Sequence, residues 1–262
     1  MTHHHSFKRD RMKKGIYVLP NLFTTANLFC GFYAAIAAMK GMYEIAAITI
    51  LIAVVLDSLD GRIARMTHTT SKFGAEYDSL CDLVTFGVAP GLMVYSWSLS
   101  SYGKWGWLAA FLFAVCGALR LARFNVQIGI IDGRVFNGLP IPGGAAVVAS
   151  GMLFYYSDYV GGQGTFTHPT VLIGVVALSL FMVSSIKYYS FKDLNVFSRK
   201  PFMSFVLIVL ILVIVVAEPQ VMLFTFAFGY SLSGPVWGLY GLIRRLLTDG
   251  KTKKVQCPDR PL

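Results

Sequence analysis

Charged residues are scarce in this chain, and their scarcity excludes an ordinary soluble protein. Asp, Glu, Lys and Arg make up 14% of the 262 residues, whereas 55% are hydrophobic. Soluble domains carry about 25% charged and about 45–50% apolar residues. The long apolar runs, interrupted by charge, glycine and proline, favour membrane helices over the alternating strands of an outer-membrane barrel. We therefore expect an integral membrane protein.

Cysteine is also rare, and its positions do not support a disulfide framework. The four cysteines show no CxxC spacing, and Cys30, Cys81 and Cys116 lie in apolar stretches. Thiols in such stretches behave as small apolar side chains. A cleavable signal peptide is not expected either, because the N-terminus is polar and basic and the first apolar run is long enough to span a bilayer.

The hydrophobic pattern predicts an all-α fold, a polytopic transmembrane bundle of eight spanning helices. The expected helices cover residues 17–39, 43–65, 76–99, 104–123, 141–160, 169–189, 201–217 and 220–246. We expect one membrane core rather than several soluble domains. The expected division is a basic tail at 1–16, a core at 17–200, two additional helices at 201–246 and a second basic tail at 247–262.

Lysine and arginine are distributed unevenly between the two sides of this expected bundle. The net charge is +10, and of the 23 basic residues only Lys40 and Lys104 fall on the side opposite the tails. Because basic residues mark the cytoplasmic side, both termini are expected to be cytoplasmic, and the basic tails to attract anionic lipids. The basic residues are divided among several membrane-flanking segments, which argues against nucleic-acid binding.

Four aspartates lie in or beside apolar runs, where an ionisable side chain is costly and usually functional. They occupy two helix faces together with small residues: Asp57, Asp60, Gly61 and Ala64 on the first, and Gly74, Asp78 and Asp82 on the second. If the two helices pack together, the carboxylates converge across a narrow groove. Oxygen-rich sites of this kind suit Mg²⁺ or Mn²⁺. Two such ions can neutralise a diphosphate and stabilise phosphoryl transfer.

Other readings of the aspartates remain open at this point. A cation or proton-coupled transporter also buries carboxylates, as does a purely structural polar network. A membrane scaffold with a relict site is a third alternative. None of these requires the accompanying pattern of Gly61, Ala64 and Arg65.

The pattern D-x2-D-G-x2-A-R-x8-G-x3-D-x3-D is matched at every fixed position over 26 residues, from Asp57 to Asp82. It resembles the signature of the CDP-alcohol phosphatidyltransferase family. The resemblance implies two metal ions, Mg²⁺ or Mn²⁺, bound by Asp57, Asp60, Asp78 and Asp82, with Asp82 also acting as the catalytic base. It further implies a set of residues that contact the CDP part: Gly61, Arg65, Ser71, Gly74, Asn21 and Thr24.

Further stretches resemble bacterial-type phosphatidylserine synthases. They are residues 27–31, 86–91, 118–125, 136–142, 182–185 and 188–192, within a resemblance that spans about residues 15–200. The implied reaction joins CDP-diacylglycerol and L-serine to give phosphatidylserine and CMP. The resemblance also implies a homodimer. The distribution of basic residues predicts a protein of the plasma (inner) membrane with its active site facing the cytoplasm. A sister enzyme that uses glycerol 3-phosphate, inositol phosphate or choline is the nearest alternative.

The motif does not indicate which alcohol accepts the phosphatidyl group. Candidates for binding the serine carboxylate or the lipid-side phosphate are Arg120, Arg123, Lys187 and Lys192. The alternative for these cations is a topological role at the anionic membrane surface. A direct transfer is expected, because no Ser, Cys or His stands where a covalent intermediate would form.

Overall fold

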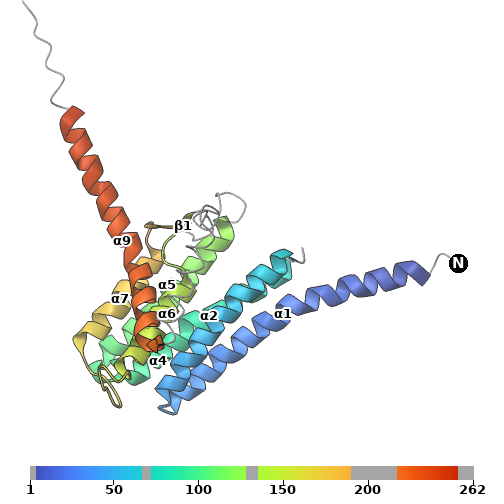
Figure 1. Ribbon diagram of the computed structural model, residues 1–262, viewed down its shortest axis with the longest axis horizontal. Helices are drawn as coiled ribbons and strands as arrows, with labels where there is room; N and C mark the ends of the chain where they lie inside the picture. The colour runs from blue at the N-terminus through green and yellow to red at the C-terminus, as the bar shows by residue number, and fades with distance from the viewer. Residues whose placement is uncertain (1–3, 67–71, 128–134, 190–216, 253–262) are drawn as a thin grey trace, which may run out of the picture.

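The computed structural model describes residues 4–66, 72–127, 135–189 and 217–252. Within these ranges the chain forms a helix bundle, from which the N-terminal part of α1 and the C-terminal part of α9 extend (Figure 1). The helices are α1 (His4–Met39), α2 (Tyr43–Met66), α3 (Lys72–Asp82), the π-helix η1 (Leu83–Val88), α4 (Ala89–Trp97), the 3-10 turn η2 (Leu99–Tyr102), α5 (Lys104–Gln127), α6 (Ile141–Tyr155), α7 (Pro169–Val183) and α9 (Pro219–Thr252).

The bundle has the helical character and apolar spans of a multi-pass membrane protein. In the described part of the chain, three helices are long and apolar enough to cross a bilayer: Asn21–Met39, Lys72–Trp97 and Lys104–Gln127. The helices α6 and α7 are shorter and also apolar. The membrane-helix prediction is confirmed at this level, whereas the expected span at 201–217 falls almost entirely outside the described residues.

The predicted helix at 169–189 is wrong at its C-terminal end. Helix α7 stops at Val183, and the following Ser184 has extended backbone angles (φ −59°, ψ 159°). Lys187–Tyr189 then forms β2, which pairs antiparallel with β1 (Val135–Asn137). The backbone N–H of Leu139 donates to the carbonyl of Phe181, so the end of α7 is satisfied by a remote segment rather than by another helical turn. The fold is therefore helical with one small β-ribbon.

The predicted helix at 141–160 is also too long. Helix α6 ends at Tyr155, and the chain then turns through Gly161 and Gly164, whose φ angles of 61° and 68° lie in the left-handed region. At the start of the helix, Pro140 and Pro142 fix an entry geometry that suits a first helical turn. The third predicted helix begins earlier than expected, at Lys72 rather than residue 76.

Helices α1 and α2 lie side by side, because small residues line their contact (Figure 1). Fully buried alanines on both helices allow this close approach: Ala34, Ala37 and Ala38 from α1, and Ala46, Ala47 and Ala53 from α2. Helix α1 also packs against α3, which carries Asp78 and Asp82.

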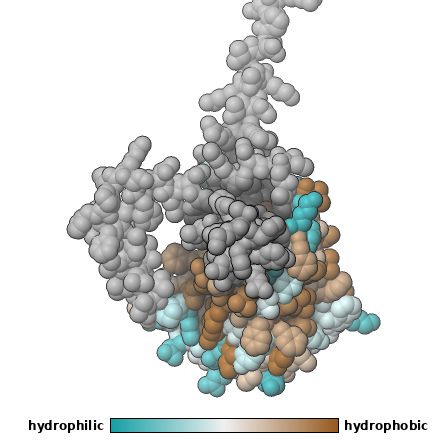
Figure 2. All heavy atoms as spheres, turned by 90° about the vertical axis from the view of Figure 1, so that its right-hand side faces the viewer, coloured by the Kyte–Doolittle hydropathy of each residue, from teal (hydrophilic) through white to brown (hydrophobic). Residues whose placement is uncertain are grey.

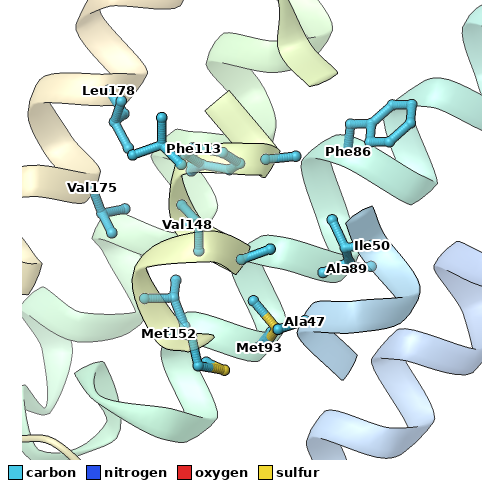
Figure 3. Packing of buried hydrophobic residues seen from close by; sticks show 14 of the residues in the cluster. Ala47, Ile50, Phe86, Ala89, Met93, Phe113, Val148, Met152, Val175 and Leu178 are labelled. Atoms are coloured by element: carbon cyan, nitrogen blue, oxygen red, sulfur yellow. The ribbon is translucent and has the colours of Figure 1, made fainter. Parts of the chain in front are cut away.

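Apolar side chains from most of the described helices fill the centre of the bundle. Figure 3 shows Ile50 of α2, Met93 of α4 and Phe113 of α5 near side chains of η1, α6 and α7. Large apolar residues such as Phe29 and Trp105 are instead exposed, at 67% and 73%. Hydrophobic side chains cover much of the described surface in Figure 2, as expected of helices that face lipid.

Candidate active site

Three of the four motif aspartates converge where α2 and α3 meet. Asp57, Asp78 and Asp82 each present a carboxylate oxygen, and these oxygens all lie within 4.8 Å of one another. Asp78 and Asp82 are one turn apart on α3, so they share a face of that helix. Asp60 lies one turn after Asp57 on α2, and its side chain is outside the described residues.

This cluster has the donor set and the environment of a divalent-cation site. Asp82 is buried, Asp57 and Asp78 are half-buried, and the Oδ1 atom of Asp78 is buried without a hydrogen-bond partner. Carboxylates so close together in an apolar bundle require a compensating positive charge. Hard oxygen ligands match Mg²⁺ or Mn²⁺. The residues present therefore fit the implied metal centre.

A protein cation stands beside the same cluster. The side chain of Arg120, in the C-terminal third of α5, is 9% exposed. Its guanidinium interacts electrostatically with Asp57 and Asp82, and also with Tyr230 of α9. Its Nε atom is buried without a hydrogen-bond partner, and the guanidinium carbon lies 5.7 Å from the centre of the Phe124 ring.

The described contacts do not place the other three candidates for acceptor binding, Arg123, Lys187 and Lys192, beside the aspartate cluster. The Nη1 atom of Arg123 donates to the carbonyl of Val183 over 3.3 Å, which caps the end of α7. Lys187 lies in β2, and its side chain is outside the described residues, as is the whole of Lys192. Arg120 is thus the one candidate whose described side chain neighbours the aspartates.

The residues expected to contact the nucleotide lie around the ends of α1, α2 and α3. Gly61 is half-buried, and a Cβ added there would meet nothing within 4 Å, so the backbone has open space beside it. Gly74 is half-buried in the first turn of α3, Thr24 is buried, and Asn21 is half-buried. The side chain of Arg65 and the whole of Ser71 lie outside the described residues.

Sequence reasoning missed the role of Asn27. This α1 side chain is fully buried, and its Nδ2 atom donates a hydrogen bond of 3.1 Å to Oδ1 of Asp82. The signal that could have found it is a polar residue three positions after Thr24 in an otherwise apolar helix. Tyr230 was missed as well, because nothing in the pattern of α9 connects it to a segment more than a hundred residues earlier.

A family model for CDP-alcohol phosphatidyltransferases matches residues 17–181. This chain belongs to the CDP-alcohol phosphatidyltransferase family. The match runs through the helices that carry Asp57, Asp78, Asp82 and Arg120, and it ends before α9. The predicted family resemblance is confirmed.

Curated relatives in this family carry the names of serine-using synthases. The chain is 39% identical over 180 residues to the CDP-diacylglycerol–serine O-phosphatidyltransferase of Helicobacter pylori, which covers 69% of this chain and 75% of the relative. The Bacillus subtilis protein of the same name is 35% identical over 174 residues, or 66% of this chain and 91% of the relative. The archaetidylserine synthase of Methanothermobacter thermautotrophicus is 35% identical over 181 residues, 68% and 72% of the two chains.

Proposed function

We propose that this protein is a phosphatidylserine synthase, which transfers the phosphatidyl group of CDP-diacylglycerol to the hydroxyl of L-serine and releases CMP. The observation that carries the proposal is the convergence of Asp57, Asp78 and Asp82 in a member of the CDP-alcohol phosphatidyltransferase family. The choice of serine is supported by bacterial relatives whose names specify that acceptor.

Two divalent cations, Mg²⁺ or Mn²⁺, would be held by Asp57, Asp78 and Asp82 with Asp60, and when bound they supply charge neutralisation at the diphosphate. Asp82 accepts the proton of the serine hydroxyl as general base. The hydroxyl oxygen then bonds to the phosphorus that carries the diacylglycerol. The bond from that phosphorus to the bridging oxygen breaks, and CMP leaves. Phosphoryl transfer depends chiefly on positioning and charge neutralisation, and the aspartates would contribute by fixing the cations that neutralise the diphosphate.

The nucleotide end of the site is assigned to the residues around Gly61. The open space beside Gly61 supports a close approach of the CDP group to the backbone. Arg65 is proposed to pair with phosphate oxygens, because a guanidinium binds phosphate through two parallel hydrogen bonds. The remaining proposed contacts of the CDP group are Asn21, Thr24, Ser71 and Gly74.

Arg120 is proposed to bind the carboxylate of serine. Its guanidinium is buried beside Asp57 and Asp82, and its Nε donor has no partner. A buried cation with an unused donor favours an acceptor that carries an anionic group. The same charge disfavours choline, which is itself a cation, whereas glycerol 3-phosphate and inositol phosphate remain the chemically closest rivals. Arg123, Lys187 and Lys192 are secondary candidates for the lipid-side phosphate.

The orientation of the enzyme in the membrane follows from the distribution of basic residues. We propose eight spanning helices with both termini in the cytoplasm of a plasma (inner) membrane protein, a site that opens to the cytoplasm and basic tails that contact anionic lipids. A homodimer is proposed from the family resemblance. A cytoplasmic site at the membrane edge would admit serine from water while the acyl chains of CDP-diacylglycerol stay in the bilayer.

The deciding experiment is an acceptor panel with the purified protein, CDP-diacylglycerol and Mg²⁺ or Mn²⁺. L-serine, glycerol 3-phosphate, inositol phosphate and choline are supplied separately, and CMP release and the lipid product are measured. We expect CMP release to depend on serine alone. CMP release with a different alcohol would identify that alcohol, rather than serine, as the acceptor. Metal-dependent ion flux in liposomes without any CMP release would overturn it in favour of a transporter.

A further inference from the structure

A buried amide touches the proposed catalytic base. Asn27 lies on α1, is fully buried, and donates from Nδ2 to Oδ1 of Asp82 over 3.1 Å. The two residues are separated by 54 others in the sequence, so only the packing of α1 against α3 brings them together. Asparagine is costly inside an apolar helix, because burying its amide group requires partners for both polar atoms.

The position of Asn27 is fixed by the start of the π-helix η1. The backbone carbonyl of Asn27 accepts a 3.1 Å hydrogen bond from the hydroxyl of Thr85, which is itself fully buried. One turn along α1, a Cβ added at Gly31 would lie 2.5 Å from the Thr85 hydroxyl oxygen, so the glycine permits this close approach. η1 begins immediately after Asp82, and single π turns within α-helices often occur at functional sites.

The amide oxygen of Asn27 does not explain why an asparagine is buried here. This Oδ1 atom is buried and has no hydrogen-bond partner within the described part of the chain. The orientation is nevertheless the favourable one, because the flipped amide would place an oxygen against the carboxylate of Asp82. A residue selected only for packing would be apolar at this point and would leave no acceptor unsatisfied. The contact with Asp82 is therefore the feature that explains an asparagine here.

We propose that Asn27 is a positioning residue for the phosphatidyl transfer, whose amide fixes the carboxylate of Asp82 in the orientation that receives the proton of the acceptor hydroxyl. The amide engages one carboxylate oxygen of Asp82, Oδ1. The hydroxyl of Thr85 holds Asn27 in place, because it donates a hydrogen bond to the backbone carbonyl of Asn27. This inference rests on the proposed function, in which Asp82 is the base.

The test compares Asn27→Leu with the wild-type protein in detergent. Leucine has a similar volume and needs no hydrogen bond. We expect kcat for serine-dependent CMP release to fall about 10- to 100-fold, as for other outer-shell partners of active-site groups. KM for CDP-diacylglycerol should stay within about twofold. The melting temperature should change little, because removal of the unsatisfied Oδ1 of Asn27 offsets the loss of the donor to the buried Asp82 carboxylate.

Two further variants separate positioning from folding. Thr85→Val removes the hydroxyl that holds Asn27 and should lower kcat by a smaller factor than Asn27→Leu. Ser179→Ala is the control, because this fully buried hydroxyl on α7 donates only within its own helix, to Val175 over 2.7 Å. Its kcat should equal that of the wild type. A fall in melting temperature in step with activity for Asn27→Leu would mark a structural role and overturn the inference.

The outcomes also separate this inference from the function on which it rests. An Asn27→Leu protein with wild-type kcat, alongside a serine-dependent wild type, would overturn the role of Asn27 and leave the function standing. A wild type that transfers to another alcohol of the panel would overturn the serine assignment, and Asn27→Leu is then measured with that alcohol. A wild type that releases no CMP with any acceptor would overturn both.

Discussion

At the scale of single residues, the site depends on how each aspartate is surrounded. Asp82 is 8% exposed and holds a hydrogen bond from Asn27, whereas Asp57 and Asp78 are half-buried. The most enclosed carboxylate is therefore the one that lies nearest a fixed donor. This difference in surroundings supports the proposed division of roles, with Asp82 as the base and the others chiefly as metal ligands.

Replacement of Asp82 by asparagine should abolish turnover while sparing lipid binding. Asn keeps the shape of the side chain and cannot accept the hydroxyl proton. We expect CMP release to fall by at least about 100-fold, the lower range for loss of a general base. Binding of CDP-diacylglycerol, measured by its effect on the melting temperature, should remain. Wild-type rates in Asp82→Asn would contradict the assignment of the base.

Arg120→Lys should weaken serine binding without comparable loss of CDP-diacylglycerol binding. Lysine keeps the charge and loses the paired donors that fit a carboxylate. Loss of a hydrogen bond to a charged group costs about 1.5–3 kcal/mol, so KM for serine should rise about 10- to 100-fold. Steady-state kinetics with each substrate varied in turn provide the measurement.

Lys104→Gln serves as the control for Arg120→Lys, because Lys104 is exposed at the opposite end of the same helix. Its kinetics should match those of the wild type. An unchanged KM for serine in Arg120→Lys would exclude Arg120 as the carboxylate partner.

At the scale of elements, α9 packs against α6 and also against the β-ribbon. Tyr188 of β2 is almost fully buried, and its hydroxyl donates to the carbonyl of Ser231 on α9 over 3.0 Å. Burial raises the pKa of Tyr188 to about 12, so the hydroxyl remains a donor at neutral pH. The Tyr188 and Tyr230 rings lie 5.7 Å apart, and Tyr230 in turn neighbours Arg120. The ribbon thus connects α9 to the surroundings of Arg120.

Gly234→Val should detach α9 from this contact. A Cβ at Gly234 would overlap the ring of Tyr188, and both groups are buried. Overpacking of this kind costs about 1–3 kcal/mol, so the melting temperature should fall by several degrees and α9 should become more sensitive to protease.

Gly229 provides the matched control on the same helix, because a Cβ added there meets nothing within 4 Å. Gly229→Val should therefore leave the melting temperature unchanged or slightly raised, because valine causes no clash there and has a higher helix propensity than glycine. Equal losses in the two variants would show that α9 is not held at Tyr188.

At the scale of the whole molecule, we expect the clustered carboxylates to make activity dependent on divalent cations. Removal of Mg²⁺ and Mn²⁺ with EDTA should reduce CMP release to background, because the clustered charges of Asp57, Asp78 and Asp82 are then uncompensated. Activity should return when either ion is added in excess. Ca²⁺ is the informative comparison, since it prefers more ligands and longer bonds. Full activity in EDTA would contradict a metal-dependent mechanism.

Much of this protein was predictable because the relevant signals are local. The period of the apolar runs identified the helices, and eight fixed positions between Asp57 and Asp82 identified the family before any contact was known. Asp78 and Asp82 lie on the same face of α3 because they are one helical turn apart. The predictions were wrong at helix ends. Helix α7, for example, is followed by β2 rather than by further helical turns, because a distant segment forms hydrogen bonds with carbonyl groups at the end of the helix.

The sequence by itself determined the membrane class, the helical elements and the family, since spacing and hydropathy are properties of neighbouring residues. The tertiary structure alone decided which polar residues meet. The contact of Asn27 with Asp82 and the place of Arg120 beside Asp57 depend on how each helix is rotated about its axis and packed against helices far away in the chain. Those rotations are set by small residues such as Gly31 and the facing alanines, whose effect appears only when both sides of a contact are present.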